Sequence, residues 1–246
     1  MITETNALGQ PIGRPLAHWN APPFPAKKDM AGRFCRVESL DPVRHAKALF
    51  DANSRDADGR MWTYLGCGPF NSFEEYAALL VKQAASIDPS FYAISDLVTN
   101  DAVGVASYMR IDPPNGVIEV GHLAFSPLLQ QTPAATEAMF LMMDHAFHLG
   151  YRRYEWKCDA LNAPSRRAAV RFGFTFEGVF RHAVVVKGRN RDTAWYSLLD
   201  TEWPSIREGY TRWLAPGNFD ERGRQRTALS AFTAAVGTAD CGSAIP

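Results

Sequence analysis

The sequence predicts a single mixed α/β domain in which one mostly antiparallel sheet is flanked by helices. Three observations support this fold class. Strand-like segments follow one another through a hairpin turn at residues 112–116, which favours antiparallel neighbours. Next come a strand-like segment at 117–125, a long helical pattern and another strand-like segment, an order typical of a strand–helix–strand unit. The chain has 246 residues, 46% of them hydrophobic, which is enough to bury a sizeable core.

Local signals define the first half of the chain. Residues 1–32 carry scattered prolines and little periodicity, which predicts an extended leader lying on the domain. A first strand is expected at 33–38. Asp41 as N-cap, followed by Pro42, predicts a helix through residue 52. Ser72 and Glu75 form a capping-box pattern that begins a second helix.

The second half follows the same logic. Strands are expected at 91–95, 103–111, 117–125 and 154–158, with a helix at 132–149 between the last two. A short helix at 164–172, strands at 174–186 and 193–201 around a turn at 187–192, and a helix ending at Leu214 complete the domain, which spans 33–215. Residues 216–246 are expected to form a polar, Ala-rich tail.

Composition excludes several classes of function. Lys plus Arg and Asp plus Glu each number 26, so nothing in the net charge favours a nucleic acid or an anionic membrane as partner. The four cysteines show no C-x-x-C spacing, so we expect no metal site and free thiols in the cytoplasm. No segment has the pattern of a signal peptide or a membrane span. The sequence does not decide between a monomer and a homodimer.

Residues 118–174 carry the most specific pattern. They contain I-E-V-G-H-L-A-F-S-P, then L-Q-Q-T-P-A-A-T-E-A, then D-A-L-N-A-P-S-R-R-A-A-V-R-F-G-F. In order and spacing this resembles the acetyl-CoA core of the GNAT N-acetyltransferase superfamily, and in particular its RimJ/RimL-like ribosomal-protein branch. The resemblance extends over roughly residues 33–204. It implies a GNAT-like acyl-CoA N-acyltransferase fold with splayed fourth and fifth strands, acetyl-CoA as cofactor, and a primary amine as acceptor, either a protein N-terminus or a small molecule.

The helix that begins near residue 132 is the candidate pyrophosphate site. A helix N-terminus presents free N–H groups and a partial positive charge. The family pattern Q/R-x-x-G-x-G/A, continued by T-x-A, matches from Gln130, except that Pro133 replaces the usual Gly. A plain capped helix is the alternative. The expected cofactor contacts are Gln130, Gln131, Thr132, Ala134, Ala135 and Thr136.

Two further segments would contact the cofactor in such a fold. The resemblance implies that backbone groups of Leu123, Ala124 and Phe125 pair with pantetheine and that one N–H polarises the thioester carbonyl. An ordinary buried strand is the alternative. It also implies that Asn162 orients pantetheine. Arg166 is placed to reach the CoA phosphates, although an exposed helix charge is the simpler interpretation.

The candidate catalytic residues are Ser165 and Glu119. The family's general-acid Tyr would fall at Ala169, and RimJ/RimL-like enzymes have Ser at the position of Ser165, which could protonate the leaving sulfur. Capping of the helix is its alternative role. Glu119 lies among apolar residues, where desolvation raises the pKa of a carboxyl group and suits it to act as the base. It could instead pair with an Arg.

His122 is the rival base, since its ordinary pKa suits proton transfer, although a strand His is more often structural. Strict alternation places it on the strand face opposite Glu119. With His122, the aromatic residues Trp62, Tyr64 and Phe70 are candidates for the acceptor pocket, with core packing as their alternative.

No Cys–His pair indicates an acyl-enzyme, so direct attack of the amine in a ternary complex is expected. Pro133 and the absent Tyr at position 169 motivate one alternative, a catalytically weak acyl-CoA-binding or scaffold protein. A generic α/β protein without a CoA site is another.

Overall fold

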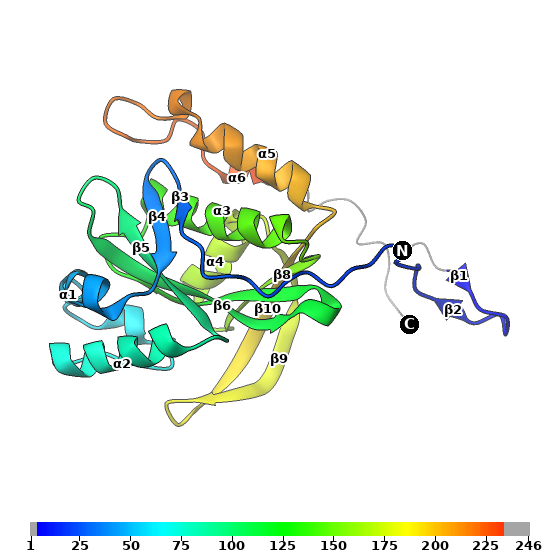
Figure 1. The fold of residues 1–246 in the computed structure, drawn as a ribbon, viewed down its shortest axis with the longest axis horizontal. Helices are drawn as coiled ribbons and strands as arrows, with labels where there is room; N and C mark the ends of the chain where they lie inside the picture. The colour runs from blue at the N-terminus through cyan, green and yellow to red at the C-terminus, as the bar shows by residue number, and fades with distance from the viewer. Residues whose placement is uncertain (1–3, 234–246) are drawn as a thin grey trace.

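A computed structural model describes residues 4–233 and shows a mixed eight-stranded sheet with helices on both faces (Figure 1). The strand order is β3-β4-β5-β6-β7-β8-β10-β9, and every neighbouring pair is antiparallel except β7 and β8. The strands are β3 (Met30–Ala31), β4 (Cys35–Ser39), β5 (Ser90–Asp96), β6 (Ala102–Asp112), β7 (Val117–Phe125), β8 (Arg153–Asp159), β9 (Thr175–Val186) and β10 (Arg189–Leu199). The predicted fold class is confirmed.

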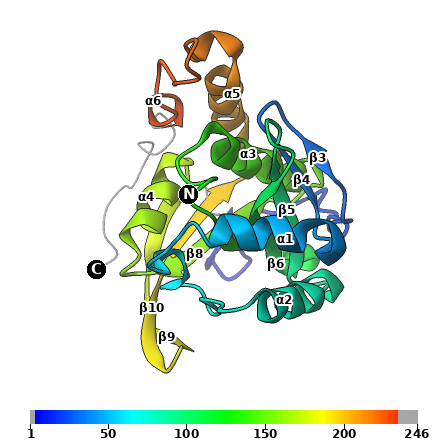
Figure 2. The same ribbon diagram turned by 90° about the vertical axis from the view of Figure 1, so that its left-hand side faces the viewer.

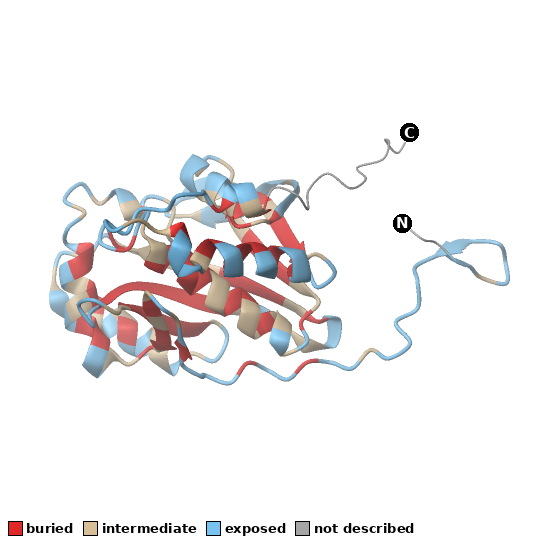
Figure 3. Ribbon diagram, turned by 90° about the horizontal axis from the view of Figure 1, so that it is seen from above, coloured by how far each residue is buried: buried red, intermediate tan, exposed pale blue. Residues whose placement is uncertain are grey.

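The helices form two layers that enclose two apolar cores (Figures 1 and 2). One face of the sheet is covered by α1 (Pro42–Asn53) and α2 (Phe73–Ala85). The other face is covered by α3 (Pro133–His148) and α4 (Ala163–Arg171), with α5 (Trp203–Leu214) packed outside α3. The buried residues follow these two interfaces (Figure 3). In residues 4–233 no helix is both long and apolar enough to cross a membrane.

The predicted helix starts on the α1–α2 face are confirmed by their capping bonds. The Asp41 carboxylate accepts the N–H of Val43 at 2.9 Å, and the Ser72 hydroxyl accepts the N–H of Glu75 at 3.2 Å. Each cap satisfies a backbone donor that the helix itself leaves free. Between these helices lies the short helix η1 (Arg60–Trp62). It begins the aromatic loop, the segment at residues 61–67 that carries Trp62 and Tyr64.

On the opposite face, α3 is fixed to the edge of the sheet through a buried carboxylate. Glu137 accepts the N–H groups of Arg33, Phe34 and Cys35 at 2.7, 2.6 and 2.9 Å. A Cβ at Gly32 would collide with this carboxylate, so the turn between β3 and β4 requires glycine there. These bonds hold the start of α3 in place.

The strands β7 and β8 separate halfway along their length. Their parallel ladder runs from Val117↔Arg153 to Val120↔Trp156 and then stops, although β7 continues to Phe125 and β8 to Asp159. The splay implied by the family resemblance is therefore present.

The same part of β7 contains a β-bulge. Its pairing with β6 changes from Val105↔Ala124 to Ser107↔Gly121, so β7 carries one extra residue. The extra residue is accommodated at His122, whose backbone adopts the left-handed conformation with φ 51°.

The hairpin of β9 and β10 differs from the predicted one. A turn was expected at 187–192, but the strands are joined by Lys187 and Gly188 alone, with φ values of 49° and 72°. Two successive positive φ values give a turn whose twist matches that of the strands, so both strands extend further. The hairpin projects beyond the rest of the sheet (Figure 1).

The segments outside the predicted domain differ from one another. In the leader, β1 (Glu4–Thr5) and β2 (Pro11–Ile12) form a small exposed hairpin away from the sheet (Figure 1). Trp19, by contrast, donates its indole N–H to Pro114 O at 3.1 Å. Residues 216–233, expected as part of the tail, pack on the domain through η3 (Pro216–Asn218), the buried Leu229 and α6 (Ser230–Thr233). The rest of the predicted tail, 234–246, lies outside the described residues.

Candidate active site

A cavity of about 590 Å³ opens where β7 and β8 separate. Its walls come from the aromatic loop at 61–67, from α2, from the β6–β7 hairpin, from β8, from the start of α4, and from Arg191 of β10. The predicted site residues that line the cavity are Trp62, Tyr64, Glu119, His122, Leu123, Ala124, Asn162 and Ser165.

The prediction that Glu119 and His122 lie on opposite faces of the strand is wrong. Val120 packs in the core on the α3 side, so its neighbour Glu119 faces the α2 side. The His122 ring lies on that side too, 5.0 Å from Phe91 of the other core. Both side chains line the cavity from this side. Strict alternation assumes a regular strand, and the bulge after Gly121 shifts the following residues by one position. Two candidate bases therefore stand in one site.

Glu119 is buried, with 2% of its surface exposed, and it is held by two cations. Its carboxylate accepts from Arg110 Nη1 at 2.7 Å and from Lys157 Nζ at 2.8 Å. Lys157 also contacts Glu155 at 2.7 Å. The alternative interpretation, a pairing with an Arg, is therefore confirmed, and a second cation was not foreseen.

His122 has no carboxylate partner among the described residues. Its Nδ1 lies 2.9 Å from the Ser107 hydroxyl, which in turn donates to Gly121 O at 3.2 Å. This network assigns the ring proton to Nδ1 and leaves Nε2 as a lone-pair acceptor. Although the ring has solvent contact along the cavity, desolvation by the cavity walls lowers the pKa of His122, and the charge of Arg110 lowers it further. The imidazole is thus neutral at pH 7.

Ser165 does not cap α4. Asn162 is the capping residue, and its side chain accepts the N–H of Ser165 at 3.1 Å. The Ser165 hydroxyl accepts the indole N–H of Trp156 at 3.0 Å. Because an acceptor role leaves the hydroxyl hydrogen free, Ser165 can still donate a proton toward the cavity that it lines.

The start of α3 offers backbone donors beside the cavity rather than within its lining. Thr132 is the N-cap, and its hydroxyl accepts the N–H of Ala135 at 3.2 Å. Within residues 4–233 the N–H groups of Gln131 and Ala134 donate to no backbone or side-chain acceptor. Two free donors and two small buried side chains, Ala134 and Ala135, fit an anion of the size of a pyrophosphate group.

Two acceptors near the start of α3, the Phe125 carbonyl and the Thr136 hydroxyl, are already occupied by protein donors. Gln130 donates its side-chain N–H to Phe125 O at 2.7 Å, which occupies a carbonyl that was expected to face pantetheine. The Thr136 hydroxyl accepts from Arg171 at 3.1 Å. Phe125 does not line the cavity, whereas Leu123 and Ala124 do.

Two predicted site residues lie elsewhere. Phe70 does not line the cavity; its ring packs 5.3 Å from those of Trp62 and Tyr76, so core packing, its alternative role, is what the structure shows. Arg166 lines a separate hollow beside α4, where its guanidinium contacts Ala160 O and the Tyr196 hydroxyl, each at 3.3 Å.

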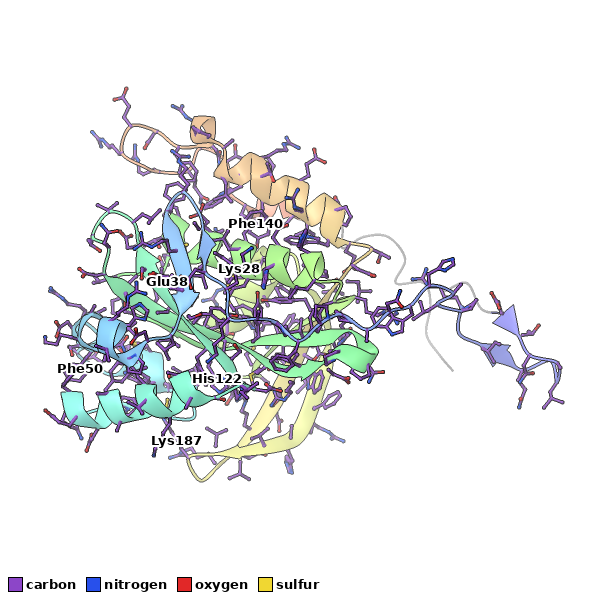
Figure 4. All side chains as sticks on the ribbon, in the orientation of Figure 1. Lys28, Glu38, Phe50, His122, Phe140 and Lys187 are labelled. Atoms are coloured by element: carbon purple, nitrogen blue, oxygen red, sulfur yellow. The ribbon has the colours of Figure 1, made fainter. Side chains whose placement is uncertain are left out.

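The aromatic loop is held against the cavity from two sides. Lys187, at the tip of the β9–β10 hairpin, donates to Trp62 O at 2.8 Å and to Gly68 O at 2.9 Å. Tyr64 donates to Leu161 O at 3.2 Å. Figure 4 shows Lys187 and His122 on the side of the sheet that carries α2.

Sequence reasoning missed Arg110, Lys157, Cys158 and Arg191 among the cavity residues. Lys157 had a usable signal, because Arg153, Glu155 and Lys157 alternate along one strand and so mark a charged face. Arg110 lies in the β6–β7 hairpin, nine residues from its partner Glu119, but no residue pattern marks it as a site residue. The position of Arg191 depends on the pairing of β10 with β8, which are far apart in the sequence.

Comparisons with known proteins place this arrangement in a family. The family model described as acetyltransferase (GNAT) domain matches residues 39–175. A GCN5-related N-acetyltransferase from Brucella melitensis is 48% identical, covers 89% of this chain and 100% of its own, and superposes with a TM-score of 0.87. A curated relative, the uncharacterized N-acetyltransferase p20 of Bacillus licheniformis, is 30% identical over 151 residues, which are 60% of this chain and 84% of that protein.

The chain belongs to the GNAT acetyltransferase family, a class of acyl-CoA-dependent acyltransferases, and it has the splayed sheet expected of that fold. Members of this family use acetyl-CoA to acetylate amines. The predicted resemblance is confirmed. RimL, a ribosomal L7/L12 alpha-N-protein acetyltransferase, covers 70% of this chain and 94% of its own with a TM-score of 0.61, and at 21% identity this shows a shared fold alone.

Proposed function

We propose that this protein transfers the acetyl group of acetyl-CoA to a primary amine by direct attack in a ternary complex. The observation that carries the proposal is the meeting of His122 and Ser165 in one cavity at the splay of β7 and β8. The neutral imidazole of His122 can accept a proton and the hydroxyl of Ser165 can donate one, and the two residues line the same cavity from different elements.

The donor half of the reaction uses backbone groups. The N–H groups of Gln131 and Ala134, at the positive end of α3, bind the pyrophosphate. The backbone at Leu123 and Ala124 lines the opening between the strands, where it pairs with pantetheine and polarises the thioester carbonyl. Acetyl-CoA supplies the activated acyl group, and the backbone of the chain positions the cofactor and polarises its thioester carbonyl.

His122 is the better candidate for the base. Its Nε2 is unprotonated at neutral pH and has no described partner. Glu119, the base first predicted, is desolvated as expected, but its oxygens already bind Arg110 and Lys157. We therefore propose that Glu119 holds Arg110 and Lys157 in place, and that His122 removes the proton from the attacking amine.

Ser165 is the proposed acid. As the amine nitrogen bonds to the carbonyl carbon and the carbon–sulfur bond breaks, the Ser165 hydroxyl donates its proton to the departing thiolate and regains one from solvent. Cys158 also lines the cavity, but burial raises the pKa of its thiol. A protonated thiol is a poor nucleophile, which supports direct attack over an acyl-enzyme.

The test is mass spectrometry of acceptor panels incubated with the protein and acetyl-CoA. One panel holds small primary amines and the other holds peptides with free N-termini, the acceptor class that RimJ/RimL-like activity requires. Acetylated product in either panel supports the proposal. Binding of CoA with no product in either panel supports the alternative, a catalytically weak acyl-CoA-binding or scaffold protein, which Pro133 and the Ala at position 169 motivate.

A further inference from the structure

Arg191 is a cation at the cavity wall without a counterion. It lies on β10, is half-buried and lines the cavity. Its Nε is buried with no hydrogen-bond partner among the described residues. A buried donor that stays unpaired carries a free-energy cost. Such a cost is recovered when a ligand supplies the missing acceptor.

The other charges of the cavity are already matched. Arg110 and Lys157 both bind Glu119, and Lys157 also binds Glu155. The cavity therefore holds two cations with protein partners and one, Arg191, with none in residues 4–233.

The acidic side chains closest to Arg191 in the fold are engaged elsewhere. Asp159, which lines the cavity, accepts the N–H of Leu161 at 2.8 Å within its own turn. Asp192 accepts from the N–H of His182 at 2.8 Å and from the Asn190 side chain at 3.0 Å. Neither is bonded to the guanidinium, so the excess positive charge belongs to the site.

We propose that the acceptor is a small primary amine that also carries an anionic group, a carboxylate or a phosphate, and that Arg191 binds this group. The inference rests on the proposed function and names its substrate class. A guanidinium binds both kinds of oxyanion through paired N–H donors. With the anion at Arg191, the amine extends along the cavity toward His122.

The walls of the cavity favour a small molecule over a protein terminus. The volume of about 590 Å³ is typical of small-ligand sites, and pantetheine would share it with the acceptor. The loop that carries Trp62 and Tyr64 is fastened by Lys187 and by the Tyr64–Leu161 hydrogen bond. Because this wall is held on two sides, we infer that it does not move aside for a peptide, which favours a small amine.

The test compares matched amines. Phosphoethanolamine is paired with ethanolamine, and 4-aminobutyrate with its neutral amide, so the two pairs separate phosphate from carboxylate. A neutral tripeptide amide with a free N-terminus represents peptides. The variants are Arg191→Gln, Arg191→Lys and Arg189→Gln; Arg189 is exposed on the same strand and does not line the cavity, which makes it the control.

We expect the wild type to prefer the anionic member of at least one pair in kcat/KM. Arg191→Gln should reduce kcat/KM for that member by about tenfold to a hundredfold, the range of a charge-assisted hydrogen bond. The neutral amines and the KM for acetyl-CoA should stay unchanged, Arg191→Lys should recover part of the loss, and Arg189→Gln should behave as wild type.

Three outcomes would overturn the inference while leaving the proposed function in place. They are equal use of neutral and anionic amines, a loss in Arg191→Gln that is the same for both members of a pair, and acetylation of the tripeptide with none of the small amines. A change confined to the KM for acetyl-CoA would reassign Arg191 to the cofactor. Absence of transfer to every acceptor would instead refute the proposed function.

Discussion

Glu119→Gln separates a positioning role from a catalytic one, because the two roles predict different losses. The substitution keeps the shape of the side chain and removes its charge. Arg110 then loses its ion-pair partner, whereas Lys157 keeps Glu155 at 2.7 Å. The expected result is therefore a less stable protein with the same dependence of rate on pH.

The size of the loss follows from the burial of the partners. Breaking a buried ion pair costs about 3–5 kcal/mol, and an exposed one about 0–1 kcal/mol. Lys157 and Glu119 have side chains only 7% and 3% exposed, but Arg110 is 54% exposed, so solvent screens its share. With Glu155 still in place, we expect the free energy of unfolding to fall by about 2 kcal/mol, or the Tm by about 4–8 °C.

The assay pairs urea unfolding with a pH profile of kcat/KM. Because desolvation and Arg110 lower the pKa of His122, the rate should rise with pH along a limb below pH 6.5 in both wild type and Glu119→Gln. His122→Gln is the matched variant and should flatten that limb with a smaller loss of stability. A stable Glu119→Gln protein whose limb is flattened would return the base to Glu119 and refute this reasoning.

The remaining predictions concern other parts of the site and the fold. Ser165→Ala should lower kcat by about a hundredfold or more while the Kd for CoA, measured by calorimetry, stays the same; full activity would exclude Ser165 as the acid. Ala135→Glu should weaken CoA binding by more than about tenfold through steric and like-charge repulsion at the start of α3, and unchanged affinity would place the phosphates elsewhere. Burial lowers the pKa of His45, whose Nδ1 accepts the N–H of Asp41 at 3.1 Å. The unfolded chain therefore binds more protons below pH 6.5, so thermal melts should show stability falling from pH 7.5 to pH 5.5, and less steeply in His45→Gln; an equal slope in the two proteins would contradict this.

The elements that the sequence predicts best are those with local signals. Asp41 and Ser72 cap helices where expected, and Thr132, the predicted first residue of α3, is its N-cap, so the helix begins one residue later at Pro133. In each case the side chain bonds to a backbone N–H two or three residues away, so a short window of sequence contains the whole interaction. The antiparallel order of the early strands follows in the same way from the turn at 112–116.

The features that sequence reasoning missed have no signal in a short window of sequence. Alternation along β7 fails because the strand carries a bulge at His122 in its pairing with β6, and no residue pattern near His122 indicates this bulge. The ends of β9 and β10 were misplaced for a different reason. Lys187 and Gly188 form the turn, but the polar residues after them resemble a longer loop.

The two halves of the site therefore differ in how far sequence can predict them. The proposed donor half comprises residues 123–136 and 162–165, short segments on consecutive elements, whose backbone geometry depends on caps and small side chains. The acceptor half combines the loop at 61–67, Arg110, His122 and Arg191, which the sheet order brings together from four separate elements. The proposed acceptor class rests on the second half, on the unpaired Arg191 and the fastened loop. The Arg191 and Arg189 variants therefore test it independently of the transfer chemistry proposed for the first half.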